Sequence, residues 1–376
     1  SRGLGDVYKR QILIKRCFKF VLEMGFTELD PRILSWIKKK GFIDATLPQT
    51  MAIPRILKGH NVLVMAPTGF GKTESAVFAV MNQMLKNKEL PGIRALYITP
   101  LKSLNRDLFG RILDLANHLD IEVDLRHGDT PQRVRRLQLI DPSKLMIMTP
   151  ETLQAVLIGK KFRELLKNVE WVIIDEIHEL ANNKRGSQLM LGLERLKELK
   201  GKDFQRIGLS ATIGDPENIS KFLSGDIPCE IVDARSEKKY DIKVEHPKLK
   251  AVDNEISKKI KSTLSVASCI RRMHELIETS ESTLLFVNTR ETAEALATKF
   301  RKLDMELKIA VHHSSLSKNA RIEVEKKFKE GELKAIISTS SLELGIDVGS
   351  IDLVIQYGSP RQATKLIQRV GRASHK

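Results

Sequence analysis

The chain has 376 residues, of which 41% are hydrophobic, 29% charged and 5% aromatic, and 63 basic against 47 acidic residues give a formal charge of +16. The apolar content excludes a disordered chain, and three cysteines without CxxC spacing exclude a disulfide scaffold and favour a reducing, cytoplasmic location. Since no apolar run approaches the ~20 residues that span a bilayer, we expect no membrane partner, and the positive charge favours nucleic acid over a merely solubilising surface.

The first part of the chain lacks a clear helical or strand period. We therefore expect residues 1–23 to be a non-native or unstructured leader. An ordered pattern begins at Met24, which we take as the candidate start of the native protein.

From Met24 onward, short apolar runs alternate with stretches of helical period. This alternation is typical of an α/β fold with parallel sheets covered on both faces. The rhythm breaks between Ala234 and Ser280, a Lys- and Glu-rich region, so we predict two domains, 24–233 and 234–376. Strands are expected at 62–65, 95–98, 145–148, 171–174, 207–209, 284–287, 309–311, 335–337 and 353–355.

The segment APTGFGKT (66–73) follows the first of these strands and opens a helical run. Two glycines in such a turn allow backbone N–H groups to converge on phosphate oxygens at a helix N-terminus. Lys72 can then reach the β- and γ-phosphates, and the Thr73 hydroxyl can bind Mg²⁺. A chance glycine turn is the alternative, because Ala66 stands where the general pattern has glycine. The candidate nucleotide-binding residues of the loop are Thr68, Gly69, Phe70, Gly71, Lys72 and Thr73.

An acidic pair, Asp175 and Glu176, comes directly after the apolar strand at 171–174. Alone, such a pair is usually a solvated turn. Downstream of a phosphate-binding loop, however, Asp175 is placed to hold Mg²⁺ and Glu176 to deprotonate the attacking water. The two motifs together predict ATP hydrolysis with Mg²⁺ as cofactor.

Further short motifs follow one another in a fixed order along the chain. They are TLPQ (46–49), TPLKSL (99–104), RHGDT (126–130), TPE (149–151), SAT (210–212), FVNTR (286–290), TSSLELGIDVG (339–349) and QRVGRA (368–373). In this order they resemble the Q motif and motifs Ia, Ib, Ic, III, IV, V and VI of superfamily 2 helicases of the DEAD/DEAH box type. The segment HHSSL (312–316) and the form of motif V resemble the Lhr (large helicase-related) family, in its archaeal form.

This resemblance covers residues 24–376 and implies two RecA-like domains, each a mostly parallel sheet with helices on both faces. The second domain is expected to be incomplete, because the chain stops within motif VI. The resemblance implies that Gln49 reads adenine and that Gly345 and Asp347 sense closure of the domains on ATP. The implied catalytic residues of motif VI are Gln368, Arg369 and Arg372, and the residues implied to couple hydrolysis to strand movement are His178, Ser210 and Thr212.

The implied function is that of an ATP-dependent helicase or translocase that moves 3′ to 5′ on single-stranded or partly duplex DNA in repair. An RNA helicase and a nucleotide-gated clamp without unwinding remain alternatives, since phosphate contacts carry no base information. The oligomeric state is left open. The implied strand contacts are Pro100, Leu101, Lys102, Gly128, Thr149, Pro150, Asn288, Thr289, Arg290, Thr339 and Ser340.

Some residues have simpler interpretations. An ordinary basic helix face is the alternative for Arg369 and Arg372, which lie on neighbouring helical positions. Trp36 and Trp171 are expected in the core rather than as stacking platforms for bases. The range 257–261 is interpreted as linker surface.

Two clusters of basic side chains could bind a ligand or could be ordinary surface residues. His312 and His313 point to opposite faces if they lie on a strand, which argues against a shared metal ion. Arg133, Arg135 and Arg136 are open between phosphate contacts and a solvated basic face.

Overall fold

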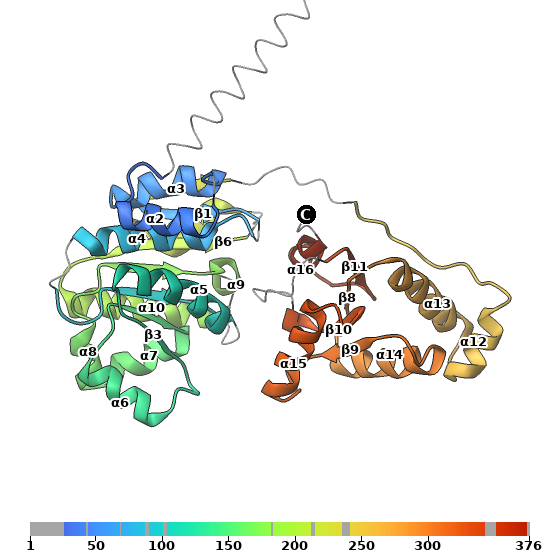
Figure 1. Cartoon of the computed structure of the whole chain (residues 1–376). Coiled ribbons are helices and arrows are strands. Elements are labelled where there is room, and N and C mark those ends of the chain that lie inside the picture. Colours follow the sequence, from blue (N-terminus) through green and yellow to red (C-terminus); the bar gives the residue numbers. More distant parts are fainter. Residues whose placement is uncertain are drawn as a thin grey trace, which may run out of the picture. The chain divides into compact units, whose positions relative to one another are not determined.

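The computed structural model of the chain describes residues 26–42, 44–67, 69–86, 90–100, 104–181, 183–211, 215–234, 241–342 and 351–373 (Figure 1). The chain divides into two units, Ser1–Ser236 and Glu237–Lys376. Each unit has a parallel sheet with helices packed on both faces, which confirms the predicted α/β fold class. The expected leader, 1–23, lies outside the described residues. Among the helices of the described ranges, none has both the length and the apolar character needed to cross a bilayer.

The sheet of the first unit has seven strands in the order β3-β4-β2-β5-β6-β1-β7. Five of them were predicted from apolar runs, whereas β3 and β7 were missed. These two are the edge strands, and their side chains are mostly half-buried, so their sequences carry polar residues and lack the continuous apolar run. The bounds are β1 Asn61–Met65, β2 Ala95–Ile98, β3 Val123–Arg126, β4 Leu145–Met148, β5 Trp171–Ile174, β6 Gln205–Ser210 and β7 Cys229–Asp233.

Two apolar layers enclose this sheet. Alternate strand residues pack on helices α2 to α5 on one face and on α7 to α11 on the other. Trp36 and Trp171 belong to the first layer, which confirms their core interpretation. The bounds are α2 Pro31–Lys39, α3 Leu47–Leu57, α4 Lys72–Lys86, α5 Leu104–Leu119, α6 Gln132–Ile140, α7 Pro150–Ile158, α8 Lys160–Leu165, α9 Ile177–Ala181, α10 Lys184–Lys200 and α11 Pro216–Ser224.

The second unit has a smaller parallel sheet in the order β11-β8-β10-β9, and all four strands were predicted. Helices α12, α13 and α14 pack on one face of the sheet, and α15 lies on the other. The bounds are α12 Asp253–Ile260, α13 Leu264–Thr279, β8 Thr283–Phe286, α14 Arg290–Leu303, β9 Ile309–His312, α15 Lys318–Lys329, β10 Ala335–Ser338, η1 Ser340–Leu342, β11 Leu353–Gln356, α16 Ala363–Val370 and η2 Gly371–Ala373.

The linker interpretation of 257–261 is wrong, because most of this range forms the end of α12. Ile256 and Ile260 lie one helical turn apart and are buried in the core of the second unit. At the start of the helix, the buried carboxylate of Asp253 accepts a hydrogen bond of 2.8 Å from Arg271 of α13. The amphipathic pattern of α12 was missed because only two isoleucines define it and the range is rich in lysine.

Candidate functional site

The polar motifs of the first unit gather at one edge of its sheet. All seven strands run parallel, so the loops that follow them leave from the same, carboxyl-terminal edge. The phosphate-loop sequence follows β1, the acidic pair follows β5, and Pro100, Gly128 and Thr149 follow β2, β3 and β4. This placement is what ligand binding in an open α/β sheet requires.

The described part of the phosphate loop has the backbone that close approach of an anion needs. Gly69 and Gly71 have φ angles of +83° and +77°, in the left-handed region that favours glycine. Lys72 begins α4 and is only 8% exposed. Its ammonium group donates to the carbonyl oxygens of Ala66 (2.6 Å) and Pro67 (3.1 Å), so the cation is held inside the loop. Thr68 lies outside the described residues.

Gln49 lies directly against this loop. Its Oε1 accepts a hydrogen bond of 2.9 Å from the backbone N–H of Thr46, and the Thr46 hydroxyl donates to the carbonyl of Phe70 at 2.8 Å. A Cβ atom added to Gly71 would lie 2.4 Å from Nε2 of Gln49. The start of α3 therefore braces the phosphate loop, and Gly71 is required by this close approach as well as by its backbone angle.

Asp175 is the most strongly perturbed carboxyl group of the site. Burial raises its pKa to about 6, and the charge of Glu176 acts in the same direction. The hydroxyl of Tyr97 donates to Oδ2 of Asp175 at 2.7 Å, and this bond and the charge of Lys72 oppose the rise. The residue is thus a buried oxygen ligand that is held in one orientation and is ionised above about pH 6.

Glu176 adopts an unusual backbone for a residue with a side chain. Its φ is +45°, and such strain costs about 1–3 kcal/mol and concentrates at functional sites. Its carboxylate is buried, and Oε2 accepts no hydrogen bond from the described residues. A buried carboxylate oxygen that accepts no hydrogen bond can take a proton from water.

Tyr97 was missed by sequence reasoning. It lies in the middle of the apolar strand β2, where a tyrosine normally indicates core packing, and it is fully buried. Its pKa lies well above 10 because burial and the charge of Asp175 both disfavour the phenolate, so it remains a hydrogen-bond donor.

His178 connects the ends of two neighbouring strands. Its Nδ1 lies 3.0 Å from the hydroxyl of Ser210, which ends β6, and 3.5 Å from Oε2 of Glu176, which follows β5. Thr212 lies outside the described residues. The structure thus brings together two of the three expected coupling residues and places them beside the acidic pair.

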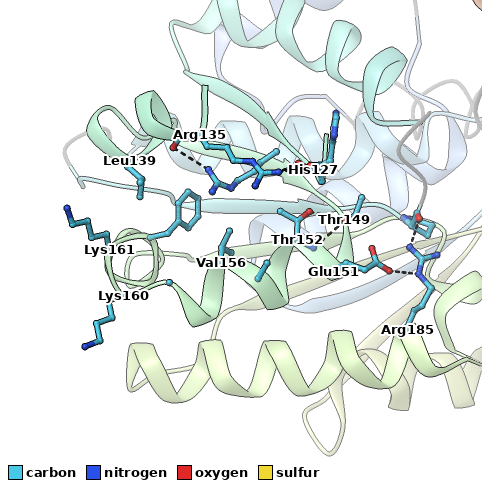
Figure 2. Close-up of a pocket in the computed structure, with 16 residues that line it drawn as sticks. His127, Arg135, Leu139, Thr149, Glu151, Thr152, Val156, Lys160, Lys161 and Arg185 are labelled. Carbon is cyan, nitrogen blue, oxygen red and sulfur yellow. Dashed lines mark hydrogen bonds and ion pairs between the residues drawn. The ribbon is translucent and has the colours of Figure 1, made fainter. Parts of the chain in front are cut away.

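Three of the expected strand contacts of the first unit, Pro100, Gly128 and Thr149, line one pocket (Figure 2). Thr149 caps α7, with its hydroxyl accepting from the N–H of Thr152 at 3.4 Å, and Pro150 is the first residue of that helix. Arg185, which sequence reasoning missed, donates to Oε1 of Glu151 and to the carbonyl of Pro100, both at 2.6 Å. It ties the loop after β2 to α7. Leu101 and Lys102 lie outside the described residues.

The expected strand contacts of the second unit also sit at strand ends. Asn288 donates to the carbonyl of Ser359 at 2.8 Å, and Thr289 caps α14. Arg290 donates to the hydroxyl of Ser315 at 3.3 Å. In the loop after β10, Thr339 is buried and Ser340 is exposed. Gly345 and Asp347 lie outside the described residues.

The two motif VI arginines do not form an exposed basic face, so that alternative is wrong. Arg369 and Arg372 are 3% and 6% exposed. The guanidinium of Arg369 donates to Oε1 of Gln356 at 2.5 Å and lies 5.1 Å from the ring of Phe286. Gln368, which directly precedes Arg369 in α16, is half-buried.

The two adjacent histidines point apart, although only His312 lies on a strand, as the last residue of β9, and His313 follows it. Nε2 of His312 lies 2.8 Å from Glu325 of α15, whereas Nε2 of His313 lies 3.0 Å from Glu294 of α14. These two helices belong to opposite faces of the sheet. The two rings therefore do not share one ligand.

Comparison with known proteins places these features in a family. Residues 46–220 match the family model of the DEAD/DEAH box helicases, and 266–375 match that of the helicase conserved C-terminal domain. The chain is 42% identical over 369 residues to the ATP-dependent helicase Lhr-Core of Sulfolobus acidocaldarius, covering 92% of this chain and 41% of that protein. Lhr-Core protein 2 of Thermococcus barophilus is also 42% identical, with 92% and 42% covered.

Among solved structures, the helicase Lhr of Mycobacterium smegmatis bound to single-stranded DNA and AMP-PNP is similar, with a TM-score of 0.78 and 35% identity. The match covers 93% of this chain and 46% of that one. The chain thus spans about two fifths of the length of the archaeal relatives that it matches. The match also confirms two RecA-like domains as the fold.

Proposed function

Because this chain belongs to the DEAD/DEAH box helicase family, in its Lhr branch, we propose that it is an ATP-dependent helicase or translocase that moves 3′ to 5′ on single-stranded DNA. The observation that carries the proposal is the buried group at the edge of the first sheet. A lysine held in a phosphate loop, an oriented aspartate and a buried glutamate whose Oε2 accepts no hydrogen bond from the described residues meet there. A role in DNA repair is part of the proposal and rests on the Lhr resemblance alone.

The donor set fits Mg²⁺, which prefers oxygen ligands and keeps several waters. Asp175 and the Thr73 hydroxyl would hold the ion, since the carboxylate is fixed by Tyr97 and Thr73 follows the loop lysine in α4. Neutralisation of phosphate charge is the chemistry that such an ion would supply when bound.

The remaining catalytic roles belong to residues of this chain. Lys72 binds the β- and γ-phosphates through its charge, Gln49 binds the adenine edge, and Glu176 takes a proton from the attacking water. In the proposal Arg369 and Arg372 stabilise the charge that develops on the transferred phosphoryl group, an effect of ~10³ to 10⁵ in rate. Gln368, Gly345 and Asp347 complete the response to ATP.

Strand movement depends on communication between hydrolysis and the strand. We assign this to His178, which contacts Ser210 and lies next to Glu176; Thr212 shares the role. The strand itself contacts both units through its phosphates, which agrees with the preference of a +16 chain for a polyanionic partner. The similar mycobacterial helicase binds single-stranded DNA in its solved structure, which favours DNA over RNA.

The test is displacement of a labelled strand from short duplexes with a 3′ or a 5′ single-stranded extension, made of DNA or RNA. The proposal predicts ATP-dependent displacement from the DNA duplex with a 3′ extension. Displacement from RNA alone supports the RNA helicase instead. ATP-dependent strand binding without displacement by the chain as it stands identifies a clamp.

A further inference from the structure

The pocket of about 910 Å³ in the first unit reaches well beyond the expected strand contacts. At one end lie Arg185 and Glu151, next to the loop after β2, and at the other end Lys160 and Lys161 extend from the start of α8 (Figure 2). Between these ends the wall is partly apolar and includes Phe162. The volume is within the ~300–1,000 Å³ of small-molecule sites, so an unpaired nucleotide fits in it.

The pocket carries more positive charge than the protein itself neutralises. Its cationic side chains are Arg126, Arg135, Lys160, Lys161 and Arg185. Glu151 is the acidic residue of the lining, and its ion pair is with Arg185. Within the described ranges, none of the other four cations forms an ion pair with a carboxylate. Such an excess favours an anionic ligand.

Two of these cations are built into the wall. The guanidinium of Arg126 lies 4.5 Å from the ring of Phe162, and its Nη1 donates to Oε1 of Gln138 at 2.9 Å. Burial and the neighbouring charge of Arg135 both lower the pKa of Arg126. Arg135 donates to the carbonyl of Gly128 at 2.6 Å, and its buried Nε has no partner among the described residues. Two fixed guanidinium groups without a carboxylate match the planar, bidentate recognition of phosphate.

We propose that this pocket binds a phosphodiester group of an unpaired nucleotide, so that the strand continues past Gly128 and Thr149 toward Arg126, Lys160 and Lys161. The inference rests on the proposed function, since it names where the strand of the helicase goes. The proposal rests on continuity, because Gly128 and Thr149 line the same pocket as the four cations that form no ion pair with a carboxylate of the described ranges. ATP has its own site, at Lys72 after β1. Of the three arginines after motif Ib, the proposal includes Arg135 as a phosphate contact, whereas Arg133 and Arg136 are exposed on α6.

The experiment measures the affinity of the chain for a fluorescent single-stranded oligodeoxynucleotide at a series of salt concentrations. The variant is the double substitution Lys160→Ala/Lys161→Ala, in which both replaced side chains are exposed, so that folding is preserved. We expect the affinity at low salt to fall on the order of tenfold. The logarithmic slope of affinity against salt should become shallower by ~0.7 for each phosphate that the variant no longer neutralises.

The matched control is Lys58→Ala/Lys202→Ala. It removes two exposed lysines that precede β1 and β6, at the opposite edge of the same sheet. A second variant, Arg126→Lys, keeps the charge but removes the planar fork, and we expect an intermediate loss of affinity. Thermal unfolding of each variant verifies that the fold is intact.

The possible results distinguish failure of the pocket inference from failure of the proposed helicase function. If the native chain binds the oligonucleotide and both pocket variants match the control, the pocket inference is overturned and the helicase proposal stands. If the native chain binds no strand and hydrolyses no ATP, the proposed function fails first. If inorganic phosphate binds in the pocket, shown by a ³¹P signal that the double variant loses, while strand affinity is unchanged, the site serves a free anion and the inference is overturned.

Discussion

Tyr97→Phe removes one hydroxyl from the centre of the first sheet and leaves the packing of the ring in place. That hydroxyl donates to Oδ2 of Asp175 at 2.7 Å. The hydrogen bond favours the ionised carboxylate, so it lowers the pKa of Asp175 against the rise caused by burial. Without the bond, the pKa of Asp175 rises further above about 6.

The size of the effect follows from the charge on the acceptor. A hydrogen bond to a charged group contributes about 1.5–3 kcal/mol, and 1.36 kcal/mol corresponds to one pKa unit. The pKa of Asp175 should therefore rise by about one to two units in the variant. Since only the ionised carboxylate holds Mg²⁺, activity falls as the pH falls through this pKa. The acid limb of the activity profile should move upward by the same amount.

The assay is the pH dependence of kcat/KM for ATP hydrolysis with Mg²⁺ and single-stranded DNA, since kcat/KM reports ionisations of the free enzyme. Near pH 7 the variant should be slower by about two- to tenfold, and near pH 9 it should approach the native rate. Tyr357→Phe, in the second unit, is the matched control and should leave the acid limb in place. A Tyr97→Phe enzyme with an unshifted acid limb, or one that is slower by a constant factor at every pH, would refute the orienting and charge-stabilising role of Tyr97.

Three other substitutions test the same site. Gly71→Ala should weaken ATP binding by at least about tenfold, because the added Cβ would lie too close to the side chain of Gln49. The control is Gly59→Ala, since Gly59 has a similar φ of +84° and no neighbouring atom within 4 Å of an added Cβ. Equal ATP binding by the two variants would contradict the role of Gln49. Glu176→Gln should retain ATP binding by fluorescent-nucleotide titration but lose hydrolysis, and loss of binding instead would identify a structural acid. Asp175→Asn should raise the free energy of unfolding of the first unit, measured in urea, by up to ~3 kcal/mol above pH 6. The reason is that the pKa of Asp175 is about 6 in the folded state and 3.8 in the unfolded state, so the ionised carboxylate destabilises the folded state above pH 6. The gain should vanish below about pH 4, where both states are protonated, and a gain that is independent of pH contradicts the assignment.

Strands with a continuous apolar run and motifs with unusual residue combinations could be predicted from the sequence. Nine strands contain a continuous apolar run and were predicted from it, including the half-buried edge strand β11, whereas the half-buried edge strands β3 and β7 carry charged residues and were not. The phosphate loop and the acidic pair were predicted because glycine, lysine and carboxylate at strand ends have few structural uses.

The supporting residues carry no such signal. Tyr97 is indistinguishable from a core residue in its strand, and Arg185 is one of many surface-type arginines in a helix. Only the register of β2 against β5, which pairs Tyr97 with Ile173, brings the hydroxyl to the acidic group at the end of the neighbouring strand. Helix α12 was not predicted for a related reason: only two isoleucines form its apolar face, and the surrounding residues are mostly charged or polar.

We propose that the buried group around Lys72 hydrolyses ATP in response to a nucleic-acid strand. The most direct measurement is ATP hydrolysis by the native chain and by Lys72→Ala, alone and with single-stranded DNA or RNA of equal length, at low and high salt. We expect stimulation by DNA that high salt removes, and no hydrolysis by Lys72→Ala under any condition. Hydrolysis that persists in Lys72→Ala, or native hydrolysis that no strand stimulates at either salt concentration, would contradict it.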